Sequence, residues 1–447
     1  MSKILLLLAA LSLFSAAGAQ NRPGDSQRGS QKTKKHAERM SGDYDPTVLG
    51  LGRRSAGLSQ SVIDRTVLNY YRTHVPGFRQ SHMPNFIIVS PNGKTSLGIG
   101  GYVNFRTSYE FNGIVEDLDF KTWDIPVPRS YDSRQKLTMD ASTTRLFFKA
   151  MADTRALGLV TAYVETDFRG YHDYNLRLRL AYITFKGLLF GQNVTTFCDL
   201  NASPTTVDFE GPNAYNLNFN TMIRYTYTSR DGRFQTAVAA EMPELSATFG
   251  ERFGSVPQRM PDFPLYVQYN WGSKRDSHLR ASAVFRDLYY YNMERGATLS
   301  SFGWGVQLSG NVKIARRWNT FLQMVYGSGI TPYIQDITGS GLDLVPNPAG
   351  SCRMQTLPML GWFAAGRYAL SRRAAVSGGY SQVRVNRRHG YGPAEQYHVA
   401  QYVFGNIFWN ISPHMEVAVE YLYGTRKNMD GRQGCANRVQ AMIQYNF

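Results

Sequence analysis

The chain has 447 residues, with 49 Lys and Arg against 33 Asp and Glu, and a formal net charge of +16 at pH 7. Its three cysteines form no CxxC pair and no Cys/His spacing suited to zinc, so the sequence predicts neither a metal site nor a cofactor. Tyrosine, phenylalanine and glycine are abundant while the mean hydropathy is −0.34, which is typical of barrels with one face in lipid and one in water. The basic excess indicates attraction for anions.

Residues 1–19 predict a secretory signal peptide. Lys3 supplies the positive start, residues 4–14 are apolar, and residues 17–19 are small, as a cleavage site before Gln20 requires. The apolar run is shorter than the roughly 20 residues of a membrane-spanning helix. Export makes nucleic acid the least suitable of the anionic partners.

Residues 20–94 form a polar, basic N-terminal segment. Up to about residue 60 it is rich in Gly, Ser and Arg and has no apolar period, so we expect a partly disordered tail. Residues 58–74, which include Leu58, Val62 and Tyr70, could form one short amphipathic helix.

Sustained alternation of apolar and polar residues begins at Ser96, and each alternating run predicts a strand. In the fourth run, Leu178, Leu180 and Tyr182 share one parity, and arginines occupy the other. The last run ends on Phe447, and a terminal aromatic residue is typical of the closing strand of outer-membrane barrels. The predicted strands are 96–111, 140–152, 159–169, 173–185, 188–195, 219–228, 233–242, 263–272, 277–290, 300–313, 318–328, 356–370, 374–386, 397–411, 414–425 and 436–447.

The links between these strands alternate in length. Links after even-numbered strands, such as 186–187 and 412–413, are short, whereas links after odd-numbered strands, such as 112–139 and 329–355, are usually long. Short turns at one end and long loops at the other are expected of a transmembrane barrel, and a soluble sandwich has no reason to sort its loops this way. We therefore predict an all-β fold, a transmembrane antiparallel barrel of about 16 strands, over residues 95–447.

The polar parity of these strands carries many arginines. Each Lys or Arg at the bilayer midplane costs about 2–4 kcal/mol, so this parity is expected to face an aqueous lumen. Rings of basic residues select anions, and the arginine fork suits carboxylates. The alternative is a wall ladder in which each arginine pairs with a neighbouring acid, although basic residues outnumber acids on this parity. The predicted pore-lining residues are Arg106, Arg177, Arg179, Arg224, Arg280, Arg286, Arg384 and Arg438.

Residues 196–218 follow the fifth predicted strand and are rich in acids and turn residues. The third external loop of sixteen-stranded porins commonly folds into the barrel and narrows it. We therefore expect a constriction loop in which Asp199, Asp208 and Glu210 oppose the wall arginines and set a transverse field. The alternative is an ordinary loop that caps the barrel.

The cysteines are Cys198, Cys352 and Cys435. The predicted topology puts Cys352 and Cys435 in two outward loops, where an exported protein can form a disulfide. Three unpaired thiols are the alternative.

Several short blocks, in order along residues 95–447, are similar to the corresponding blocks of DcaP-like porins. They are SLGIGGYV (96–103), LLFGQ (188–192), TFCD (196–199), Pro204, VDFEGP (207–212), YGSGI (326–330), Tyr333 and EYLYG (420–424). The resemblance implies a trimeric, sixteen-stranded outer-membrane porin that passes small anions, often dicarboxylates. Family members often begin with a coiled coil, whereas this N-terminal region has no sustained heptads.

The sequence thus predicts an outer-membrane porin of a diderm bacterium, in contact with lipid and lipopolysaccharide, passing small anionic solutes through an arginine-lined lumen. The alternatives are a structural or adhesin barrel with a closed pore, and a barrel hydrolase. The eight histidines are scattered and carry no local motif of an active site, so we predict that the chain is not an enzyme.

Overall fold

The computed structural model describes residues 46–50, 58–74, 83–113, 118–128, 131, 133, 135–171, 174–273, 275–349 and 352–447. The predicted signal peptide (1–19) and the tail up to residue 45 lie outside the described residues. Pro46–Phe447 form a single unit, which is the one described below.

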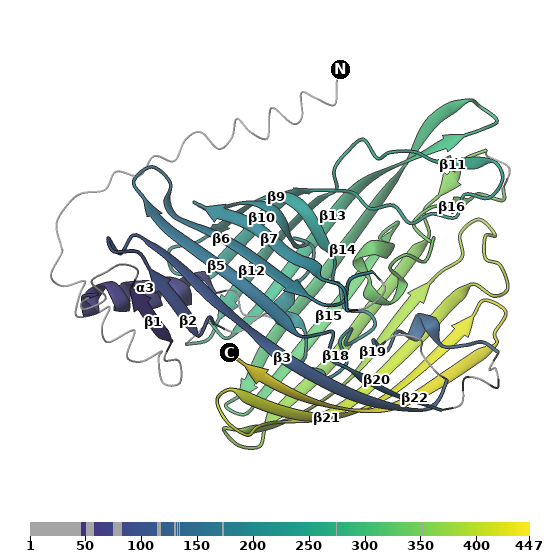
Figure 1. Ribbon diagram of the computed structural model, residues 1–447. Coiled ribbons are helices and arrows are strands. Elements are labelled where there is room, and N and C mark those ends of the chain that lie inside the picture. Colours follow the sequence, from purple (N-terminus) through teal and green to yellow (C-terminus); the bar gives the residue numbers. More distant parts are fainter. Residues whose placement is uncertain are drawn as a thin grey trace. The chain divides into compact units, whose positions relative to one another are not determined.

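Sixteen antiparallel strands close into a barrel, which confirms the predicted fold (Figure 1). The first, β3 (Thr95–Asn112), pairs with β5 on one side and with the last strand, β22, on the other. The remaining strands of the ring pair in sequence order. They are β5 (Arg145–Thr154), β6 (Gly158–Asp167), β7 (Arg177–Phe185), β8 (Leu188–Val194), β9 (Phe219–Thr228), β10 (Phe234–Glu241), β12 (Phe263–Trp271), β13 (Ser277–Asn292), β14 (Ala297–Ala315), β15 (Trp318–Ser328), β18 (Pro358–Ala369), β19 (Ala374–Val385), β20 (Tyr397–Asn410), β21 (Met415–Asn428) and β22 (Gln433–Asn446).

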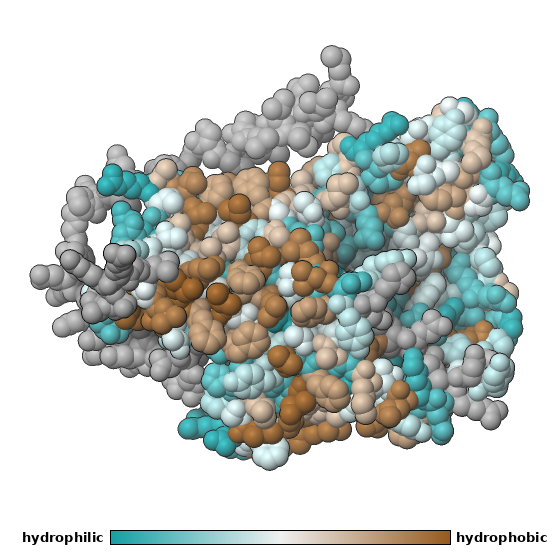
Figure 2. All heavy atoms as spheres, viewed as in Figure 1, coloured by the Kyte–Doolittle hydropathy of each residue, from teal (hydrophilic) through white to brown (hydrophobic). Residues whose placement is uncertain are grey.

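The wall turns apolar side chains outward along most of its length. In β12, Leu265, Val267 and Tyr269 are exposed on the outer surface, while Tyr266 and Gln268 are buried inside. Figure 2 shows hydrophobic side chains gathered over the wall, with more hydrophilic ones toward the loop end at the right. The alternation of a strand therefore separates a lipid-facing surface from a polar interior.

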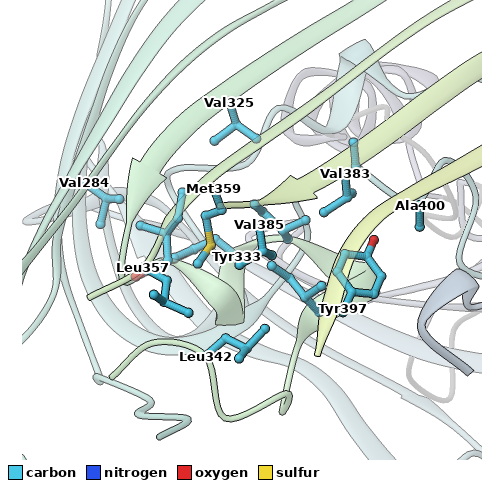
Figure 3. Close-up of a cluster of buried hydrophobic side chains, with 14 of the residues drawn as sticks. Val284, Val325, Tyr333, Leu342, Leu357, Met359, Val383, Val385, Tyr397 and Ala400 are labelled. Carbon is cyan, nitrogen blue, oxygen red and sulfur yellow. The ribbon is translucent and has the colours of Figure 1, made fainter. Parts of the chain in front are cut away.

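Two long loops fold into the barrel and fill one side of its interior. The third loop (195–218) contains the 3₁₀ turn η2 (Leu200–Ala202). The sixth loop (329–357) contains η3 (Thr331–Tyr333), η4 (Gln335–Ile337) and the short strands β16 (Val345–Pro346) and β17 (Met354–Gln355). Their apolar side chains form a buried core with the inner face of β13, β15 and β18–β20 (Figure 3). Loop residues of this core include Phe197, Ala214, Ile330, Tyr333, Ile334, Ile337 and Leu342.

Smaller elements extend the two ends of the barrel. Near the long loops, the chain forms η1 (Thr122–Asp124) and β4 (Lys136–Asp140) after β3 and before β5. At the same end, β11 (Phe253–Ser255) pairs with β13. At the end with the short turns lie β1 (Thr47–Gly50), α3 (Gln60–Thr73) and β2 (Phe86–Val89). Here β2 pairs with the start of β3, and β1 runs parallel to β2.

Within the described residues, no helix is both long and apolar enough to cross a membrane.

Candidate functional site

Two cavities lie inside the barrel, on either side of the turn that begins the third loop. The loop-side cavity, of about 460 Å³, is lined by residues of the first, second, third and sixth loops and of β6–β9. The turn-side cavity, of about 400 Å³, is lined by β7–β10, β12, β13, the start of the third loop and the end of α3. Val194 and Leu200 line both cavities, so these two side chains mark the boundary between them.

The loop-side cavity has charges of both signs. Arg169 Nη1 donates to both carboxylate oxygens of Asp119, at 2.8 and 2.9 Å. Arg179 Nε donates to Glu165 at 3.0 Å, and Arg177, which lies nearer the loop end of β7, pairs with Asp167 of the wall. The wall-ladder alternative therefore describes this cavity. Its charged lining residues are Lys121, Arg169, Arg177, Arg179, Asp119 and Glu165.

One aromatic ring of the third loop brings together two arginines that line this cavity and Arg106 of β3, a predicted pore-lining residue that is not among its lining residues. The guanidinium carbons of Arg169, Arg106 and Arg179 lie 4.6, 5.4 and 5.7 Å from the centroid of the Phe209 ring. Each such cation–π contact contributes about 0.5–2 kcal/mol, depending on how far it is desolvated. Phe209 thus holds the third loop against these arginines. This role was not predicted from the sequence, because the prediction rested only on the acids of the loop.

The turn-side cavity is positively charged, and its lining has no acid among the residues that the structure describes. Arg280 donates to Oε1 of Gln268 and to the carbonyl oxygen of Cys198, both at 2.7 Å, and its guanidinium carbon lies 3.9 Å from the centroid of the Tyr266 ring. Arg224 donates to the carbonyl oxygen of Val194 at 3.4 Å. These acceptors are neutral and orient the two guanidinium groups. The carboxylate of Asp199, which does not line the cavity, lies 3.9 Å from Arg280 Nε and offsets part of its charge.

A β-bulge in β7 changes which side chains face the interior. Glu165 of β6 lies opposite Leu180, whereas the next residue, Thr166, lies opposite Leu178, so Arg179 is the extra residue. A bulge bends its strand and re-aims the following side chains. Leu180 therefore lines the loop-side cavity and Tyr182 the turn-side cavity, although strict alternation predicted both to face outward.

Two of the predicted pore-lining arginines instead hold loops to the wall. Arg286 pairs with Asp262 and Asp343, at 2.9 and 3.2 Å, and donates to loop carbonyl oxygens. Arg438 pairs with Glu110 and donates to the carbonyl oxygen of Leu118 in the first loop. Both arginines are 2% exposed. The prediction that they line the pore is wrong, because carboxylates at the loop bases bury them.

Arg384 is a further correction, since it lies on the outer side of the wall. Its neighbours Val383 and Val385 are fully buried in the core that β19 makes with the sixth loop, and side chains alternate along a strand. Arg384 is exposed and lies opposite Val399, near the loop end of β19. The inward parity is apolar here because loop residues occupy the interior.

The three acids of the third loop do not face the cavities. Asp199 accepts hydrogen bonds from His278 Nε2 at 2.8 Å and from the Ser309 hydroxyl at 2.7 Å. Asp208 accepts from the backbone N–H of Phe120 and from the Tyr402 hydroxyl. Asp199, Asp208 and Glu210 are all buried. Of the predicted oppositions between loop acids and wall arginines, the structure brings Asp199 within 3.9 Å of Arg280. Asp199 and Asp208 also bond the loop to β13, β14, β20 and the first loop, and a transverse field across the lumen stays a prediction.

Glu210 is surrounded by other carboxylates. Burial, together with the nearby charges of Asp336, Asp119 and Asp208, raises the pKa of Glu210 well above its ordinary value, and the charge of Lys121 offsets this only in part. Neither carboxyl oxygen of Glu210 has a hydrogen-bond partner within the described residues. The carboxyl group of Glu210 is therefore the member of this cluster that we expect to be protonated.

The cysteines take separate places. The Cys352 thiol donates to Oε2 of Glu294 at 2.8 Å, and no disulfide joins the described cysteines, so the predicted Cys352–Cys435 bond is not formed in this structure. The Cys198 thiol donates to the Tyr215 hydroxyl at 3.5 Å, and burial raises the pKa of this thiol to about 12. In the described part of the chain, no group of three His, Cys, Asp or Glu residues is arranged to hold a metal ion.

Three basic residues of the cavities were missed by the predicted set. Lys121 lies in the first loop, where no alternating pattern assigns a face. Arg169 is the last residue of the predicted strand 159–169, but β6 ends at Asp167 and the structure places Arg169 in the second loop. Arg72 lies at the end of α3, which the sequence places before the barrel. The four predicted arginines that do line the cavities are Arg177, Arg179, Arg224 and Arg280.

Residues 85–263 match the DcaP outer membrane protein family. Among solved structures, the outer membrane channel DcaP of Acinetobacter baumannii is similar, with a TM-score of 0.69 and 20% identity, covering 83% of this chain and 100% of that chain. OmpT of Vibrio cholerae, in its trimer form, has a TM-score of 0.50 and 12% identity over 79% of this chain and 100% of its own. Salmonella typhi OmpF, in complex with daunomycin, has a TM-score of 0.52 and 12% identity over 80% of this chain and 99% of its own.

None of the curated protein sequences matches this chain. The family match and the similarity to the DcaP channel confirm the resemblance that the sequence blocks predicted. Together with the closed barrel, they show a fold similar to that of outer-membrane channels.

Proposed function

We propose that this outer-membrane porin allows small hydrophilic solutes to diffuse passively and prefers anions, dicarboxylates among them. The observation that supports this preference is the turn-side cavity, whose described lining includes Arg224 and Arg280 and no acid, with Asp199 outside the lining at 3.9 Å from Arg280. Basic side chains in a confined aqueous space raise the local concentration of anions and repel cations. A carboxylate can replace a neutral acceptor of either guanidinium group and gain a charge-assisted hydrogen bond.

The path that we propose runs from the loop-side cavity past Val194 and Leu200 into the turn-side cavity. The third loop narrows this path, and its acids Asp199 and Asp208 act by holding the loop in place. A solute would meet Arg179 before the boundary and Arg280 after it. Such a succession of basic sites lets an anion move between neighbours without being bound tightly at any of them.

We further propose that the chain is exported through a cleaved signal peptide, lies among outer-membrane lipid and lipopolysaccharide, and assembles as a homotrimer. A trimer form is recorded for OmpT of Vibrio cholerae, which has a similar fold. The exposed apolar wall supports the membrane setting.

The first test is the reversal potential of the purified protein in a planar bilayer across a KCl gradient. We expect the sign that marks chloride preference, and a fall in chloride current when succinate or phthalate is added. Replacing Arg224 and Arg280 together by Gln should lower the chloride-to-potassium permeability ratio about twofold or more, because two positive charges leave the lining of the cavity.

The matched control is Arg384→Gln, which removes the same side chain from the outer side of the wall. It should leave the permeability ratio unchanged. Cation preference in the native protein would contradict the proposed selectivity. A native protein that inserts but carries no current would instead favour a structural barrel, because the two loops that enter the interior would then close it.

A further inference from the structure

The helix α3 lies against the inner face of the barrel wall. Tyr70 is fully buried, and its hydroxyl donates to the carbonyl oxygen of Lys149 in β5 at 2.9 Å. A Cβ on Gly98 of β3 would lie 2.7 Å from the Tyr70 ring, so the helix approaches β3 as closely as a glycine permits. Gly98 has the same parity as Asn104, whose side chain is buried inside the barrel.

The chain around α3 extends the wall that receives the helix. β2 pairs with residues 96–99 of β3, beyond Tyr102, where β22 reaches its last pairing. This brings Ile87 and Val89 of β2 into one buried cluster with Tyr70 and with Met151 of β5. A continuous apolar contact therefore fixes α3 across the end of the barrel that has the short turns.

The C-terminal end of this helix reaches the turn-side cavity. Arg72 and His74 line it together with Arg224 and Arg280 of the wall, and Arg72 is exposed to the cavity water. Arg72 is the basic residue of the last helical turn, where the helix dipole favours a positive charge. The cavity thus has positive charge on a face that the barrel strands do not supply.

We propose that α3 is part of the pore: it narrows the turn-side exit, and Arg72 joins Arg224 and Arg280 as a third anion-binding side chain there. The proposal rests on the function proposed above and deepens it, because it makes the segment before the barrel a determinant of selectivity. It also predicts a directional effect, since an anion entering from the short-turn end meets Arg72 first.

The test compares Arg72→Glu with Arg65→Glu in the full chain, in the same bilayer measurement. Arg65 is on the same helix but donates to the carbonyl oxygen of Gly93 and does not line the cavity. Arg72→Glu should lower the chloride-to-potassium permeability ratio about twofold or more, and should weaken block by succinate more from the short-turn side than from the loop side. Arg65→Glu should change neither property.

A second variant moves the helix without changing its charges. Gly98→Leu places a side chain where the Tyr70 ring lies, whereas Gly405→Leu adds the same side chain to a strand position with nothing within 4 Å of the new Cβ. Gly98→Leu should raise the conductance, and combining it with Arg72→Glu should remove most of the effect of Arg72→Glu, because the charge no longer lies at the exit. Gly405→Leu should behave as the native protein.

The outcomes separate the two proposals. A native protein without anion preference would contradict the proposed function, whatever the variants do. An anion-preferring native protein in which Arg72→Glu matches Arg65→Glu, and Gly98→Leu matches Gly405→Leu, would overturn the role of α3 and leave the proposed function standing.

Discussion

The behaviour of an arginine in this barrel depends on the acceptors within its reach. Arg280 and Arg286 lie on the same inner face of β13, six residues apart, so the alternation of side chains along the strand predicts that both line the pore. Arg280 hydrogen-bonds to an amide and a backbone carbonyl and lies 3.9 Å from the carboxylate of Asp199, whereas Arg286 pairs with the carboxylates of Asp262 and Asp343 at 2.9 and 3.2 Å. Arg280, which lines the turn-side cavity, keeps more of its charge available to a solute, and Arg286 is a structural cross-link between two loops and the wall.

Glu210 gives the residue-scale prediction. A carboxyl whose folded-state pKa is raised above its unfolded value destabilises the folded state as the pH rises from the unfolded value, near 4.5, toward the folded one. Glu210→Gln removes this cost. The thermal unfolding temperature of the variant should therefore equal that of the native protein at low pH and exceed it increasingly toward neutral pH.

The measurement is thermal unfolding in detergent at several pH values. Glu251→Gln is the control, because Glu251 is exposed in the fourth loop and should give no pH-dependent difference. A difference between Glu210→Gln and the native protein that stays constant with pH would contradict the assignment of the raised pKa.

At the scale of elements, one wall residue holds the third loop. Glu420 of β21 accepts hydrogen bonds from the backbone N–H groups of Val207 and Asp208, and from the side chains of Asn406 and Gln440. A carboxylate that accepts several donors in a buried site fixes the segment that carries them, because each unsatisfied donor costs about 1–3 kcal/mol.

Glu420→Ala should therefore loosen the third loop. We expect larger current fluctuations in single-channel records and faster proteolysis within residues 195–218, with the barrel still folded. Glu416→Ala is the control, since Glu416 lies on the same face of β21 and makes no hydrogen bond to the described residues of this loop. Equal current noise in both variants would show that other contacts hold the loop.

The sequence predicted the strands well because each strand has its own alternation. The fifth predicted strand, 188–195, differs by one residue from β8 (Leu188–Val194). The bulge at Arg179 and the inward Val383 and Val385 were not predictable in this way. Both depend on partners far along the chain: the register of β6 against β7, and the sixth loop packed on β19.

At the scale of the whole molecule, the two faces of the wall have different solvents. Val267, at the middle of β12, is exposed on the outer surface, whereas Thr226 of β9 lines the turn-side cavity. Val267→Arg should lower the free energy of unfolding in lipid vesicles by about 2–4 kcal/mol. Thr226→Arg should leave it nearly unchanged, because the new charge remains in water.

Denaturant unfolding of the refolded barrel in vesicles measures both values. If the two variants lost similar stability, the outward and inward faces of the wall would have been assigned wrongly.

The pairing of β2 with β3 also bears on how the barrel avoids pairing with other chains. The barrel closes where β22 pairs with β3. β3 begins at Thr95, but β22 ends at Asn446, opposite Tyr102, so the first residues of β3 extend past this seam. A strand edge of this kind is a template for pairing with a second chain, and proteins cover such edges or keep them short. β2 covers the edge, and the strand left outermost, β1, has only four residues. The segment before the barrel thus protects the seam from strand exchange and aggregation at high local protein concentration.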